Sequence, residues 1–87
     1  SQQAVWNGLD YFCKELSALG VPFIPSQGNF VLLDVQRDAT EVFQQCLRQG
    51  VILRTVKEYG LPTHLRMSVG LEDENKWAIQ ALTHTLQ

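Results

Sequence analysis

The stretch "THLRMSVG" (residues 63–70) places a guanidinium group in the middle of an apolar strand. Alternate positions are polar and apolar, which predicts a β-strand with one face buried against the core. The polar positions are His64, Arg66 and Ser68, and the apolar ones are Leu65, Met67 and Val69. Arg66 therefore lies on the polar face, where it needs water, an internal carboxylate or a bound anion as its partner.

Three more segments upstream of this strand have extended character. Residues 29–35, "NFVLLDV", are apolar on both faces apart from Asp34, which predicts a central strand. Residues 21–24, "VPFI", form a short extended segment, and residues 51–56, "VILRTV", form a strand after Gly50. "PSQG" (25–28) reads as a turn and "KEYGLP" (57–62) as a loop, because glycine and proline interrupt both.

Three amphipathic helices separate or flank these strands. The first ends at Gly20, the second begins at Asp38, with Glu41 as the reciprocal half of a capping box, and the third covers residues 72–86. The predicted apolar positions are Val5, Leu9, Phe12, Leu16 and Leu19 in the first helix, Val42, Phe43, Cys46 and Leu47 in the second, and Ala78, Ala81, Leu82 and Leu86 in the third, widened by Trp77 and Ile79.

This order of elements predicts an α/β (α+β) two-layer sandwich. A small mixed or antiparallel sheet of about four strands is covered on one face by three helices, and residues 1–87 form a single domain. The first helix begins almost at residue 1 without a cap, so we expect a fragment of a longer chain.

Composition excludes several classes of protein. The net charge is −2 and no basic run occurs, which argues against nucleic-acid binding. No apolar run reaches the ~20 residues needed to span a membrane, and no signal peptide is apparent. Cys13 and Cys46 lie on apolar helix faces, which predicts buried thiols in a cytoplasmic protein, with a disulfide between them as the alternative. His64 and His84 lack metal-ligand spacing, so no metal site is predicted.

Two of the four arginines lie inside predicted strands. Arg54 shares a strand face with apolar residues, and Arg66 lies on a neighbouring strand, so the two cations would repel each other without an acceptor. Asp34 and Glu58 could pair with them internally. A ligand carboxylate or phosphate could do the same, and the residues alone leave both interpretations open, with internal pairing the simpler.

Three segments in order resemble the C-terminal small domain of histidinol-phosphate aminotransferases, a branch of the fold type I enzymes that use pyridoxal 5′-phosphate. They are "GNFVLLDV" (28–35), "GVILRTV" (50–56) and "YGLPTHLRMSVGLEDEN" (59–75). The resemblance implies that the full-length protein is a cytoplasmic homodimer that transfers an amino group between histidinol phosphate and 2-oxoglutarate in histidine biosynthesis.

The same resemblance assigns roles to three residues. Arg66 would bind the carboxylate of glutamate in one half-reaction and the substrate phosphate in the other. Arg54 would help to bind that phosphate. Asn29 matches the asparagine of the family's "NF" pair, and we expect its side chain to form a hydrogen bond to a nearby loop, with contact to the substrate as the alternative. By the same analogy Tyr59 and His64 would flank the approach to the site.

The resemblance also implies that the chemistry lies outside these 87 residues. The family needs a lysine in a Ser-x-x-Lys setting, and none of the three lysines has one: Lys14, Lys57 and Lys76. We therefore predict no catalytic and no cofactor-binding residue here, and we expect the large cofactor-binding domain to be elsewhere. The isolated chain is predicted to be inactive and free of pyridoxal phosphate.

Other functions remain open at this point. Related fold type I enzymes include aromatic aminotransferases and a phosphothreonine decarboxylase, and the arginine face could also belong to a free-standing α/β anion-binding regulatory module. Among the remaining residues, Asn75 is predicted to be structural and Trp77 to pack in the core or at a domain interface. Leu71 provides no side-chain acceptor at the start of the third helix, a loss of about 1 kcal/mol.

Overall fold

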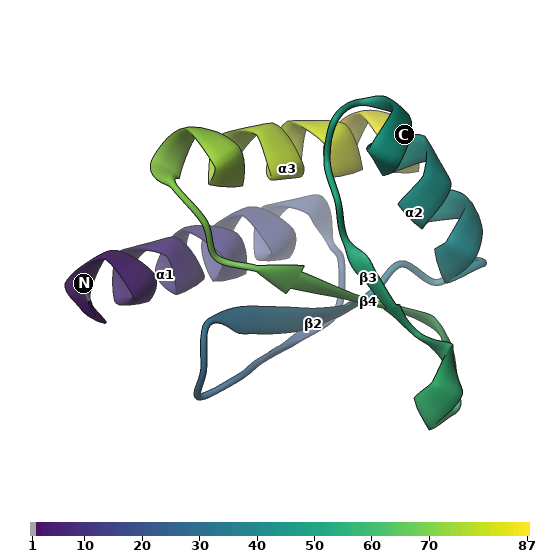
Figure 1. Ribbon diagram of the computed structural model, residues 1–87, viewed down its shortest axis with the longest axis horizontal. Coiled ribbons are helices and arrows are strands. Elements are labelled where there is room, and N and C mark those ends of the chain that lie inside the picture. Colours follow the sequence, from purple (N-terminus) through teal and green to yellow (C-terminus); the bar gives the residue numbers. More distant parts are fainter. Residues whose placement is uncertain (1) are drawn as a thin grey trace.

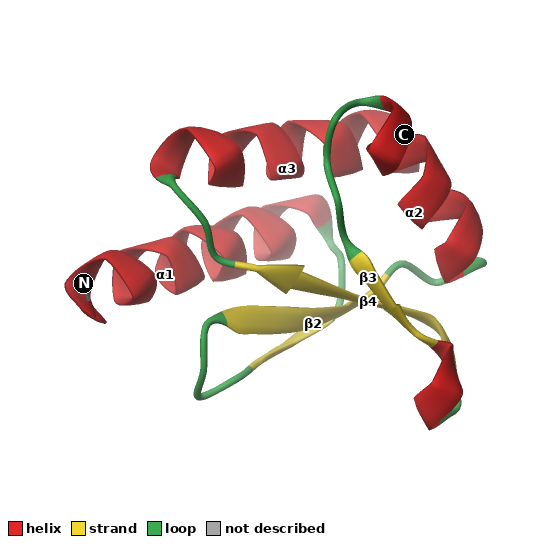
Figure 2. Ribbon diagram, viewed as in Figure 1, coloured by secondary structure: helices red, strands yellow, loops and turns green. Residues whose placement is uncertain are grey.

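A computed structural model describes the backbone of residues 2–87 and the side chains from residue 7 onward. One antiparallel four-stranded sheet, in the order β1-β2-β4-β3, is covered by three helices on one face only (Figures 1 and 2). The predicted two-layer sandwich is confirmed, and the sheet is antiparallel throughout. The elements are α1 (Gln2–Leu19), β1 (Phe23–Pro25), β2 (Phe30–Asp34), α2 (Ala39–Arg48), β3 (Arg54–Val56), the 3₁₀ turn η1 (Lys57–Tyr59), β4 (Leu61–Ser68) and α3 (Glu72–Leu86).

The two interior strands are β2 and β4, as the sequence predicted for the segment around Val31 and Leu33. Residues on the helix-covered face of these strands are completely or almost completely buried: Val31, Leu33, Leu65 and Met67. Their neighbours in sequence lie on the opposite face, which no helix of the described chain covers (Figure 1). The alternation in "THLRMSVG" therefore separates a core face from an open face.

The boundaries of the third and fourth strands differ from the prediction. Residues 51–53 make no ladder with β4, and β3 begins only at Arg54. Val51 and Leu53 are buried by side-chain packing alone, so their apolar pattern indicated a strand where no backbone pairing forms. The predicted loop at 57–62 is a 3₁₀ turn ended by Gly60, whose φ of 78° favours glycine, and β4 already begins at Leu61.

The predicted apolar stripes are correct near the middle of each helix and wrong at the ends of α1 and α2, whereas Phe43 of α2 and Leu86 at the end of α3 are partly buried and pack against the core. Leu9, Phe12 and Leu16 of α1 are buried, as are Val42 and Cys46 of α2 and Ala78, Ile79, Ala81 and Leu82 of α3. Leu19 and Leu47, by contrast, are exposed near the last turns of their helices. Val5 lies outside the residues whose side chains are described.

Trp77 is the largest error in the predicted core. Its side chain is 57% exposed, because one step along a helix rotates a residue by about 100° away from the stripe that holds Ala78 and Leu82. The indole Nε1 donates a hydrogen bond to the carbonyl of Gln49 at 2.8 Å, so the ring rests on the end of α2. The remaining part of that prediction, packing at a domain interface, stays open.

The two helix starts that the sequence singled out differ in their capping. Asp38 caps α2 as predicted, accepting a hydrogen bond from Thr40 N at 3.1 Å, but the carboxylate of Glu41 accepts from Gln45 Nε2 instead of completing the capping box. At the start of α3 the side chain of Leu71 contains no hydrogen-bond acceptor. The carboxylate of Glu74 accepts from Leu71 N at 2.7 Å and satisfies one exposed donor there.

Both cysteines are free, which makes the alternative of a disulfide wrong. Cys46 is fully buried and Cys13 is half-buried, and burial raises the pKa of each thiol. No group of three or more histidine, cysteine or carboxylate side chains in the described part of the chain could hold a metal ion. None of the helices within residues 2–87 combines the length and apolarity that crossing a bilayer requires.

Candidate anion-binding site

Arg54 and Arg66 lie directly opposite each other on the adjacent strands β3 and β4. Side chains of directly opposite residues in an antiparallel pair project to the same face, here the open face of the sheet. The sequence placed the two arginines on neighbouring strands, and the register of β3 against β4 brings them together. Two unit positive charges are thus held side by side at the edge of the sheet.

No carboxylate in the described part of the chain lies within 4.0 Å of either guanidinium. Asp34 is occupied elsewhere: it accepts hydrogen bonds from Gln36 N and Thr63 Oγ1, each at 2.9 Å, and its other oxygen lies 3.9 Å from His64 Nε2. These contacts, the Gln36 amide first, lower the pKa of Asp34. The internal pairing that the residues alone favoured is therefore absent, which leaves water or a bound anion as the partner of each guanidinium.

Arg66 is half-buried and lies against an aromatic ring. Its Cζ atom is 4.2 Å from the centroid of the Phe30 ring, a cation–π contact. Its Nε atom is closed off from solvent and has no hydrogen-bond partner. Buried donors are usually paired, so this unpaired one needs an explanation.

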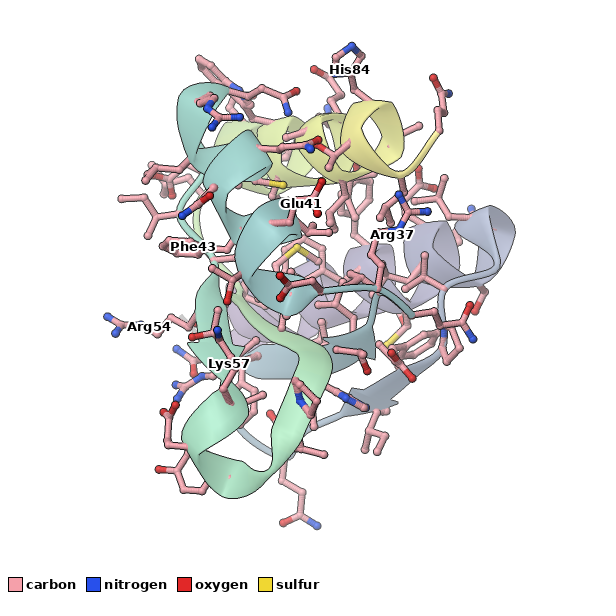
Figure 3. All side chains as sticks on the ribbon, turned by 90° about the vertical axis from the view of Figure 1, so that its right-hand side faces the viewer. Arg37, Glu41, Phe43, Arg54, Lys57 and His84 are labelled. Carbon is pink, nitrogen blue, oxygen red and sulfur yellow. The ribbon has the colours of Figure 1, made fainter. Side chains whose placement is uncertain are left out.

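A hollow of about 510 Å³ opens beside the two arginines. Its lining combines apolar walls with the two cations and is made of Phe43, Ile52, Leu53, Arg54, Thr55, Val56, Glu58, Tyr59 and Arg66. Figure 3 shows Arg54 projecting away from the ribbon, on the same side of the molecule as Phe43 of α2. Glu58 shares the hollow but forms no ion pair with either arginine.

The surroundings of Arg54 differ from the prediction. We expected an apolar strand face, but Arg54 is exposed and Ile52 is 75% exposed, because the segment before Arg54 runs free of the sheet. Arg54 is therefore the more solvated cation, and Arg66 the more enclosed one. The pair can neutralise a dianion, which one guanidinium would do poorly.

Asn29 does not line the hollow, and it contacts the strand of Arg66 through its backbone rather than its side chain. Its carbonyl accepts a hydrogen bond from Val69 N at 2.7 Å and so joins the start of β2 to the end of β4. Within residues 7–87 its exposed side chain makes no hydrogen bond, so the predicted side-chain bond to a nearby loop is not observed.

Three other residues named from the sequence have clear positions. Asn75 is buried, its Oδ1 accepting from Gly70 N at 2.8 Å and its Nδ2 donating to Gly70 O at 3.3 Å, which supports the structural role predicted for it. Tyr59 lines the hollow and is exposed. His64 faces Asp34 instead of the hollow.

The residue that sequence reasoning missed is Phe30, which lies diagonally across the strand pair from Arg66.

The lysines do not form a site for an aldehyde cofactor. Lys14 and Lys57 are exposed, and Lys76 pairs with Glu72 at 3.5 Å on the surface of α3. None of them lines the hollow beside the arginines. The described lysines therefore bring no amine to the hollow, so its lining does not fit pyridoxal phosphate, and no step of that cofactor's chemistry is assigned to these residues.

Comparison with known proteins defines the class. The family model for aminotransferase class I and II matches residues 1–82, so the chain belongs to this family, whose members generally depend on pyridoxal phosphate. Among individual relatives, the chain is 54% identical over all 87 residues to the histidinol-phosphate aminotransferase of Bdellovibrio bacteriovorus. It is also 54% identical over 69 residues, or 79% of its length, to histidinol-phosphate aminotransferase 2 of Pseudomonas aeruginosa. It spans only 23% and 19% of the lengths of these two relatives.

Solved structures confirm the fold. A putative aminotransferase from Burkholderia pseudomallei superimposes with a TM-score of 0.86 at 23% identity, covering 98% of this chain and 26% of that one. An aspartate aminotransferase from Thermotoga maritima gives a TM-score of 0.85 at 18% identity, covering 97% and 23%. At these identities the similarity concerns the fold alone.

Proposed function

We propose that this chain is the substrate-anchoring small domain of a pyridoxal-phosphate-dependent aminotransferase that acts on histidinol phosphate and 2-oxoglutarate in histidine biosynthesis. The observation that carries the proposal is the pair Arg54 and Arg66, held opposite each other without an internal carboxylate and beside an open hollow. The 54% identity over the whole chain to a histidinol-phosphate aminotransferase supports this choice of substrate.

In this proposal the two arginines divide the binding of the anion. Arg66, half-buried and in cation–π contact with Phe30, binds the carboxylate of glutamate or the phosphate of histidinol phosphate with its planar guanidinium. Arg54, exposed at the edge strand, adds a second charge when the ligand carries two negative charges. One guanidinium is enough for a monoanion such as a carboxylate, whereas a dianion such as a phosphate ester gains from both. One site can therefore serve both half-reactions.

The other parts of the enzyme come from outside these residues. The chain spans about a fifth of the length of its relatives, and its own lysines do not line the hollow. We propose that a larger domain of the same polypeptide supplies the lysine and the cofactor site, in a cytoplasmic homodimer. The open face with Arg66 would then meet that domain, and closure would exclude water from the bound anion.

The decisive experiment compares substrates and one conservative variant in the full-length protein. We expect turnover of histidinol phosphate to exceed that of phenylalanine and phosphothreonine at equal concentration. The variant Arg66→Lys should raise KM for both histidinol phosphate and glutamate by roughly 10- to 100-fold, because a point charge replaces a bidentate fork.

Arg48→Lys is the matched control, since Arg48 is an exposed residue of α2 and should tolerate the change without effect. Preferred turnover of phenylalanine or phosphothreonine would assign a different substrate. Unchanged KM values in Arg66→Lys would show that Arg66 does not anchor the substrate. Phosphate binding without turnover of any amino donor would instead favour the regulatory module.

A further inference from the structure

Phe30 contacts Arg66 on the open face of the sheet, outside the hydrophobic core. Phe30 is half-buried on the open face and does not belong to the hydrophobic core. The strand register pairs Phe30 with Ser68 and Leu32 with Arg66, so the ring reaches Arg66 along the diagonal of β2 and β4. Its 4.2 Å contact is with the charged carbon of the guanidinium.

The turn before β2 fixes the backbone of Phe30. Ser26 donates through its hydroxyl to Phe30 O at 2.7 Å, and its own amide donates to the same carbonyl at 3.2 Å. The same hydroxyl accepts from Gly28 N at 3.0 Å and from Phe30 N at 3.4 Å. The stretch "PSQGNF" is thus a closed turn whose bonds converge on the residue that carries the ring.

Arg66 needs such a support because the positive charge of Arg54 repels its guanidinium. Arg54 is directly opposite and carries the same charge, and no carboxylate of the described residues holds Arg66 in place. A long side chain under repulsion would turn toward water. The negative face of an aromatic ring attracts the cation and opposes that movement without occupying any of its N–H donors.

We propose that Phe30 is a positioning residue that holds the guanidinium of Arg66 for end-on binding of an anion. The Phe30 ring centroid lies 4.2 Å from the central carbon of the guanidinium, and Nε is closed off from solvent. A carboxylate or phosphate therefore meets the two terminal nitrogens rather than the Nε edge. This inference rests on the proposed role of Arg66 in binding a substrate anion.

The test uses the full-length protein with Phe30→Leu and, as a second ring-less variant, Phe30→Met. We expect KM for histidinol phosphate and for glutamate to increase roughly three- to tenfold in both variants, with kcat changed less than twofold, because the fork is present but less often in place. Phe30→Tyr keeps the ring and should restore both KM values to within about twofold. Phe23→Leu is the matched control, since Phe23 pairs with Leu33 and belongs to the helix-covered face.

The outcomes separate this inference from the proposed function. Raised KM in Arg66→Lys together with wild-type KM in Phe30→Leu or Phe30→Met would overturn the role of Phe30 alone. Wild-type KM in Arg66→Lys would overturn the proposed function itself, whatever Phe30 does. If neither ring-less variant folds, Phe30 serves the fold rather than Arg66, and the inference is likewise overturned.

Discussion

The two faces of the sheet are built from alternate residues of the same strands, yet they differ in composition and in burial. On the covered face, Leu65 and Met67 are buried under the three helices. On the open face, Arg66 follows Leu65 directly in sequence and is only half-buried, with Phe30 diagonally across from it on β2 and Arg54 opposite on β3. The comparison teaches that one strand can stabilise the fold with one set of residues and leave the alternate set on an open face, where the candidate site lies.

The largest expected effect is on the unfolding free energy, and it tests the difference between the covered face and the open face. Leu65→Ala should lower the unfolding free energy of the 87-residue chain by about 2–5 kcal/mol, because it opens a cavity in a fully buried site. Leu32→Ala, the same change on the open face, should cost about 1 kcal/mol because Leu32 is only partly buried. Chemical denaturation measures both, and equal losses would contradict the separation of the two faces.

The next effect concerns the junction at which the Arg66 strand joins α3. Asn75→Ala removes both side-chain hydrogen bonds to Gly70 and should destabilise the chain by about 1–3 kcal/mol. Gln80→Ala, at an exposed position of the same helix, serves as the control and should be nearly neutral. A neutral Asn75→Ala would mean that α3 alone, without this clamp, fixes the end of β4.

A smaller effect tests the repulsion on the open face. Arg54→Met should raise the unfolding free energy in chloride buffer by about 0.2–1 kcal/mol, because it removes a like charge directly opposite Arg66. Inorganic phosphate should then stabilise the wild-type chain more than the variant, since the anion binds the folded pair. Arg48→Met on α2 is the control, and an equal gain there would show that net charge, not the pair, is responsible.

The smallest expected effect is the pH dependence set by Asp34. Hydrogen bonds from Gln36 N and then Thr63, together with His64, lower the pKa of Asp34 in the folded chain. Its contribution is therefore complete above the unfolded value of about 3.9 and is lost as pH falls through the lower folded value. Asp34→Asn should remove less than about 1 kcal/mol of stability at neutral pH and flatten the acid limb of the stability curve.

Acid titration of unfolding measures this contribution. Thr63→Val, which removes one of the donors, should give an intermediate curve. An acid limb in Asp34→Asn as steep as that of the wild type would assign the acid sensitivity to other carboxylates.

Local patterns predicted much of this molecule. The period-two alternation around Leu65, the stop at Gly20 and the cap at Asp38 each depend on a few neighbouring residues, and each is observed. The errors arose where a pattern does not determine packing. Residues 51–53 are buried without being paired, and Leu47 is exposed although it continues an apolar stripe, because it lies near the last turn of α2.

The same distinction between local pattern and tertiary packing applies to the candidate site. The sequence by itself determined that Arg66 stands on the polar face of a strand and that Arg54 lies in another, since side-chain direction in a strand follows from position alone. Only the tertiary structure decided that the two face each other, that Asp34 is engaged elsewhere and that Phe30 lies against Arg66. Register and cross-strand diagonals join residues far apart in the chain, and they are fixed by how the whole sheet packs rather than by any local preference.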